Sequence, residues 1–84
     1  MEDVFKKQII DIVANLLKKS SADIDETQSF DTLGIDALDL FEMVLKLEDT
    51  FLIEISDDEF EKVASIPDVL TLVVSKNIKK ETVK

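Results

Sequence analysis

The sequence predicts an all-α fold, a small four-helix bundle of three longer helices and one short third helix, with a long loop between helices 1 and 2. Two observations predict it. Apolar side chains recur at helical spacing along much of the chain, and three segments open with residues that favour helix starts. A length of 84 residues allows one domain. We assign residues 1–78 to this domain and residues 79–84 to a frayed C-terminal tail.

The first helix is expected over residues 3–18. Its apolar stripe consists of Phe5, Ile9, Ile12, Val13, Leu16 and Leu17. Residues 20–35, "SSADIDETQSFDTLGI", then break the helical pattern and read as a long polar loop. Four apolar side chains should pin this loop to the core: Ile24, Phe30, Leu33 and Ile35. Loops of this length inside a compact domain are uncommon and often functional.

The second helix should begin after Asp36, a good N-cap residue, and run to about Thr50, with Asp39 adding a favourable charge in its first turn. Two apolar lines follow this helix. The first is predicted to be buried and consists of Leu40, Met43, Val44, Leu47 and Phe51. The second lies beside it and consists of Leu38, Phe41 and Leu45. The spacing leaves two interpretations of the second line, a binding surface or ordinary core packing.

Two further helix starts follow. The stretch "FLIEI" alternates like a strand, but no other segment could pair with it. Ser56 and Glu59 have the spacing of a capping box, which predicts a short helix over residues 57–63. In "SIPDV" we expect Ser65 to cap the last helix, with a proline in its first turn. The following "VLTLVVS" is rich in β-branched residues, yet the start signal favours helix over strand.

Composition excludes several classes of function. The chain has no cysteine and no histidine, so it lacks the usual thiolate nucleophile, general base and transition-metal ligands. The net charge is −9, and most of the acids fall between residues 20 and 62. Such a field repels nucleic acid and anionic lipid and attracts basic protein surfaces. The sequence shows neither a signal peptide nor a run of roughly 18 apolar residues, so we expect a cytoplasmic protein that does not span a membrane. From the charge we expect no binding to nucleic acid or to membranes, and we expect a monomer.

Neither an EF-hand nor catalysis is indicated, although clustered carboxylates could bind divalent cations weakly. The stretch "DIDETQSFDTLG" spaces its oxygens like a calcium loop, but Gln28 and Gly34 stand where an EF-hand needs glycine and glutamate. The carboxylates have no apolar pocket that could raise a pKa, and a single glycine excludes a glycine-rich phosphate loop. We therefore expect no metal site, no catalytic residue and no enzyme activity.

The start of the second helix carries a family resemblance. The stretch Gly34-Ile35-Asp36-Ala37-Leu38 resembles the acyl carrier proteins, whose hallmark there is Gly-x-Asp-Ser-Leu. The resemblance extends over nearly the whole chain, including the acidic second helix and the short capped third one. In that family the serine bears 4′-phosphopantetheine, which carries acyl chains as thioesters between the enzymes of fatty-acid biosynthesis. It implies that Gly34, Asp36 and Leu38 are the motif and that Ala37 stands at the attachment position.

The departure from the family pattern falls on the attachment residue. Alanine has no oxygen for a phosphodiester, so no cofactor can be attached at Ala37. Two explanations account for an alanine at this position. One is a deliberate serine-to-alanine substitution; the other is a natural adaptor that lacks the phosphopantetheine arm and acts only by binding proteins. The native codon at position 37 would distinguish the two. Polyketide, peptidyl and D-alanyl carriers are further alternatives. The intact surroundings of Ala37 favour a substituted carrier, and the strong acidity of the chain favours the discrete fatty-acid type.

The resemblance also implies partners and an acyl site. The partners would be phosphopantetheinyl transferases and fatty-acid-synthesis enzymes with basic docking surfaces. On this chain the partner-binding residues would be Asp36, Asp39, Phe41, Glu42, Leu45 and Glu48. The acyl chain would lie in a cleft between helices, for which the candidates are Met43, Val44, Leu47, Ile55, Phe60, Val63 and Ile66.

Overall fold

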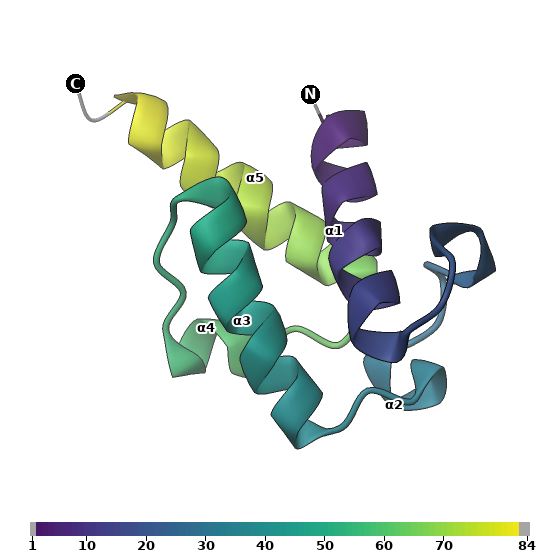
Figure 1. The fold of residues 1–84 in the computed structure, drawn as a ribbon. Coiled ribbons are helices and arrows are strands. Elements are labelled where there is room, and N and C mark those ends of the chain that lie inside the picture. Colours follow the sequence, from purple (N-terminus) through teal and green to yellow (C-terminus); the bar gives the residue numbers. More distant parts are fainter. Residues whose placement is uncertain (1, 83–84) are drawn as a thin grey trace.

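The structure is a computed structural model that describes the backbone of residues 2–82 and the side chains of residues 3–77. Its helices, in chain order, are α1 (Glu2–Leu17), η1 (Ser21–Asp23), α2 (Phe30–Leu33), α3 (Ala37–Phe51), α4 (Asp57–Glu61) and α5 (Ile66–Thr82). No strand occurs among residues 2–82. The predicted all-α class is confirmed, with α1, α3 and α5 as the three longer helices and α4 as the short one (Figure 1).

The core lies where α1, α3 and α5 meet. α1 makes its most extensive helix contacts with α5 and further contacts with α3, and α5 runs obliquely behind both helices (Figure 1). The buried residues of this core are Ile9, Ile12, Val13, Phe30, Ile35, Met43, Leu47, Phe51, Ile53, Ile55, Ile66, Val69 and Val73. The rings of Phe5 and Phe51 meet edge to face, with centroids 5.3 Å apart, and so join α1 to the end of α3.

The long loop contains two elements that the sequence pattern did not indicate. Both η1 and α2 are too short to show a helical period, and each begins at a serine. Ser20 accepts a hydrogen bond from the amide of Ala22, and Ser29 accepts one from the amide of Thr32. The predicted anchors are confirmed: Phe30 and Ile35 are buried, while Ile24 and Leu33 are half-buried and packed against the core.

Backbone contacts also hold this loop against the entrance to α5. The amide of Phe30 donates to the carbonyl of Ala64 at 2.8 Å, and Ser29 and Ser65 form an isolated antiparallel bridge. This bridge involves single residues, so the fold remains helical. The segment "FLIEI" forms no strand, which agrees with the sequence analysis.

The helix ends differ from the expected positions in two places. α4 ends at Glu61, two residues before the expected 63. α5 continues to Thr82, so residues 79–82 are helical where the sequence analysis placed a frayed tail; residues 83 and 84 lie outside the described part of the chain. Lysine and glutamate favour helix, which accounts for the continuation through "KKET". The domain boundary at residue 78 stays a prediction.

The starts of α4 and α5 are held by different hydrogen bonds. The capping box of α4 is present, with Ser56 and Glu59 each accepting from the other's backbone amide. At α5 the hydroxyl of Ser65 instead donates to Asp68, which also accepts from the amide of Ala64 at 3.0 Å. The carboxylate of Asp68 therefore organises the start of α5.

The short helix α4 is joined to α5 by an ion pair that should respond to pH. Glu59 lies 2.7 Å from the ammonium of Lys76, and this contact, with the amide of Ser56, lowers the pKa of Glu59 from 4.5 to about 2. A carboxyl group whose pKa is lowered by folding stabilises the fold above its unfolded pKa and loses that effect as pH falls through the folded one. The Glu59→Gln variant should therefore melt below the parent chain at neutral pH, and the difference should vanish as pH falls from about 5 to about 2.

Circular dichroism melts across that pH range would measure this difference. The control is Glu61→Gln, which removes the same charge from an exposed position of the same helix. We expect its curve to stay close to that of the parent. A difference between Glu59→Gln and the parent that persists undiminished at the lowest pH would contradict the assigned ion pair.

Candidate functional site

The turn into α3 depends on Gly34. This residue ends α2 with φ 94° and ψ 19°, a left-handed conformation in which its amide donates to the carbonyl of Asp31. A Cβ atom built on Gly34 would meet nothing within 4 Å, so the glycine is required by conformation rather than by close packing. The buried side chain of Ile35 fixes the next residue to the core, and its amide donates to Phe30.

The N-terminus of α3 is a closed capping box. The amide of Asp39 donates to the carboxylate of Asp36 at 2.9 Å, and the amide of Asp36 donates back to Asp39 at 3.5 Å. The first intrahelical hydrogen bond joins the amide of Leu40 to the carbonyl of Asp36. Ala37 is thus the first helical residue, exposed at the positive end of the helix dipole. The N-cap prediction for Asp36 is confirmed.

Position 37 does not fit covalent attachment of the group that the resemblance implies. The side chain of Ala37 is a methyl group, which has no lone pair and no exchangeable proton. The amides of Ala37 and Leu38 precede the first intrahelical hydrogen bond, and such amides attract anions at helix starts. The backbone at this position suits a phosphate, whereas the side chain cannot be bonded to one.

The second apolar line of α3 lies on the surface. We call it the apolar strip: Leu38, Phe41 and Leu45, which are 66%, 63% and 51% exposed. In the other line, Met43, Leu47 and Phe51 are buried, and Leu40 and Val44 are half-buried against the core. Of the two interpretations that the spacing left open, core packing is therefore wrong for the strip. Apolar side chains gathered in this way often mark a protein-binding surface.

The acids of α3 fall into two groups. Asp39, Glu42 and Asp49 are three and seven residues apart, so they lie along one edge of the strip. Glu48 is different, because it is half-buried and its carboxylate accepts from the amide of Ile55 at 2.9 Å. Its backbone carbonyl also accepts from the amide of Ile53. Glu48 therefore braces the turn after α3, an internal role that the sequence pattern did not indicate.

The predicted acyl-cleft residues form one apolar group in the interior. Met43, Leu47 and Ile66 are fully buried, and Ile55 is nearly so. Val44, Phe60 and Val63 are partly buried against the same core. Val63 also lines a hollow of about 360 Å³ between α4 and α5, and Ile55 lines one of about 560 Å³ beside the end of α3. The structure brings the seven residues together, and their use as an acyl site stays a prediction.

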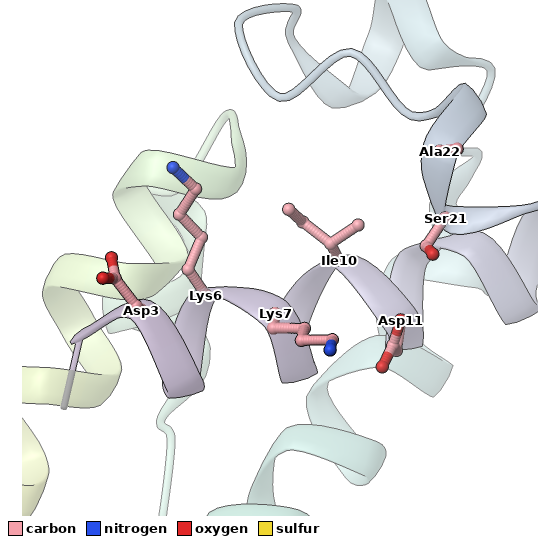
Figure 2. Close-up of a pocket in the computed structure, with 7 residues that line it drawn as sticks. All are labelled: Asp3, Lys6, Lys7, Ile10, Asp11, Ser21 and Ala22. Carbon is pink, nitrogen blue, oxygen red and sulfur yellow. The ribbon is translucent and has the colours of Figure 1, made fainter.

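A further hollow, of about 280 Å³, lies between α1 and η1. Figure 2 shows it, with its lining residues Asp3, Lys6, Lys7, Ile10, Asp11, Ser21 and Ala22. Its charges are of both signs, and Lys6 forms an ion pair with Glu26 at 2.7 Å that raises the pKa of the lysine. None of the site residues predicted from the sequence lines this hollow.

The described residues show neither a cluster of metal ligands nor a membrane-spanning helix. Among them no three or more acidic, histidine or cysteine side chains are grouped so that they could hold a metal ion. No helix among them has the length and apolarity needed to cross a membrane.

Comparisons with known proteins agree with this arrangement. The sequence model of the family described as "Phosphopantetheine attachment site" matches residues 7–73. A curated acyl carrier protein of Clostridium acetobutylicum is 42% identical over 71 residues, covering 83% of this chain and 91% of that protein. One of Syntrophus aciditrophicus is 34% identical over 74 residues, covering 87% and 92%.

A solved structure shows the same likeness in three dimensions. The crystal structure of an acyl carrier protein from Thermotoga maritima has a TM-score of 0.79 to this fold. The two share 26% sequence identity, and the match covers 93% of this chain and 92% of the other. The family match begins within α1, includes all of α3 and α4, and extends into α5. The chain therefore belongs to the acyl carrier protein family.

Proposed function

We propose that this chain is a carrier of the discrete, fatty-acid-synthesis type in a form whose attachment position, Ala37, cannot be modified. One observation carries the proposal: Ala37 is exposed at the first position of α3, on the helix that also bears the apolar strip and the acids Asp39 and Glu42. An exposed acceptor position beside a docking surface is what a carrier needs, because its enzymes must reach both.

Without an acceptor oxygen, the expected behaviour is binding without loading. The proposed docking surface is the apolar strip together with Asp39 and Glu42, and all of these side chains are present in this chain. The hydroxyl group that is missing at position 37 would add little contact area. The chain should therefore occupy enzymes that recognise carriers and release them unchanged, as a dead-end ligand. The apolar group formed by Met43, Leu47 and Ile66 would receive an acyl chain only if that chain were attached to the carrier. Ala37 prevents this attachment.

Restoring the hydroxyl tests the proposal. Incubation of the parent chain with a phosphopantetheinyl transferase and coenzyme A should leave its mass unchanged. The Ala37→Ser variant should gain one phosphopantetheine group, because serine supplies the missing nucleophilic oxygen. Intact-protein mass spectrometry measures both results.

The matched control is Ala22→Ser, which adds the same hydroxyl at an exposed alanine in η1. It should remain unmodified, since position 22 does not lie at the start of α3. Circular dichroism would show that both variants keep the helical fold. If Ala37→Ser folds and still resists several transferases, the proposed function is wrong.

A further inference from the structure

Leu52 combines an unfavourable backbone conformation with an exposed apolar side chain. It is the C-cap residue of α3, with φ 55° and ψ 50°, the left-handed conformation that side chains disfavour and glycine accepts. It is also 72% exposed, the highest value among the large apolar side chains that the structure describes. Neither backbone preference nor burial accounts for a leucine at this position, whereas a glycine would end the helix readily.

The turn that presents Leu52 is braced from inside. Its amide donates to the carbonyl of Glu48, and the carboxylate of Glu48 accepts from the amide of Ile55. The side chains of Ile53 and Ile55 are buried, at 8% exposure each. Because Leu52 lies between a helix and two core residues, its outward position is fixed by its neighbours. Such preorganisation lowers the entropy lost when a side chain becomes part of an interface.

Leu52 lies just beyond the end of the helix that carries the apolar strip, seven residues after Leu45. The exposed acids Asp49 and Glu54 flank it in the sequence. Beside it is the hollow of about 560 Å³, lined by Glu48, Ile53, Glu54, Ile55, Ser56, Glu59 and Lys76. Three carboxylates against one ammonium group make these surroundings acidic.

We infer that Leu52 is a partner contact that extends the docking surface to the far end of α3. The partner it fits is a fatty-acid-synthesis enzyme whose surface carries an apolar side chain bordered by lysine or arginine. A second copy of this chain fits poorly, since each copy carries a net charge of −9. This inference rests on the proposed function and adds to it a contact at the residue that ends α3.

The test uses the opposite signs of two effects. Leu52→Gly should stabilise the fold, because glycine accepts the left-handed conformation, and it should weaken enzyme binding by about fivefold or more, as loss of one well-packed contact does. Leu52→Met should retain binding close to that of the parent, because it keeps an apolar side chain. Thermal melts and surface plasmon resonance against a phosphopantetheinyl transferase and an acyltransferase of fatty-acid synthesis would measure the two effects.

The control is Lys18→Gly, at a second non-glycine residue with left-handed backbone at a helix end, with φ 58° after α1. It should stabilise the fold in the same way without weakening binding, since Lys18 lies off α3 and loses only a positive charge. A Leu52→Gly variant that binds both enzymes as the parent does would overturn the inference. If the parent binds neither enzyme and Ala37→Ser stays unmodified, the proposed function fails, and the inference fails with it.

Discussion

Replacing Leu47 by alanine is expected to lower the free energy of unfolding by about 3 kcal/mol, within the range of about 2–5 kcal/mol for buried leucines. Leu47 is fully buried where α3 faces the core, so the substitution removes apolar contacts and leaves a cavity. The same substitution at Leu45, two residues away on the same helix and 51% exposed, should cost less than about 1 kcal/mol. For a domain this small, the larger loss is a sizeable part of the total stability.

Urea denaturation followed by circular dichroism would measure both losses. Leu45→Ala serves as the control for Leu47→Ala, because both variants replace leucine by alanine within α3 and change helix propensity equally. Similar losses at the two positions would mean that the apolar strip is packed in solution. The strip would then be unavailable to a partner.

The second large effect concerns binding. Replacing Asp39 and Glu42 by lysine should weaken binding to a basic carrier enzyme by roughly tenfold or more, because each reversal removes an attraction and adds a repulsion. Most of the loss should appear as slower association and should shrink at high salt, since exposed charges act over the Debye length. Surface plasmon resonance at two salt concentrations would show this.

Asp39 requires a separate check, because it belongs to the capping box of α3. Glu42→Lys alone, at an exposed position without a capping role, should retain a measurable part of the loss with little effect on the melting temperature. The matched control is Asp11→Lys with Asp23→Lys, which changes net charge equally at exposed sites on α1 and η1. If both pairs weaken binding alike, net charge governs the interaction rather than a site on α3.

Much of the fold could be predicted because a long helix has several turns, so that the spacing of its apolar residues is visible in the sequence. α1 and α3 each show enough turns for an apolar stripe to emerge, and residues typical of helix starts precede α3, α4 and α5. η1 and α2 could not be predicted in this way, since each spans about one turn or less. Their only local signal is a serine before each, and serines are also common in loops.

The site was predicted less completely, for a reason visible in Glu48 and the apolar strip. Helical spacing shows which residues share a face of α3, but not what lies opposite that face. Leu38 and Leu47 are both leucines on one helix, and their exposure differs because the core covers only one of the two lines. The partner of Glu48 is the backbone amide of Ile55, a group that every residue but proline carries, so no sequence pattern marks it.

The packing of α1 on α5 has a consequence for synthesis on the ribosome. Ile9 and Val13 leave the exit tunnel well before Val69 and Val73, the α5 residues that complete the same core. At about 5–20 residues per second, the interval of over 50 residues lasts several seconds. During that time α1 can pack only against α3, and its more extensive contacts with α5 cannot form. The nascent chain therefore completes its core late, when α5 emerges.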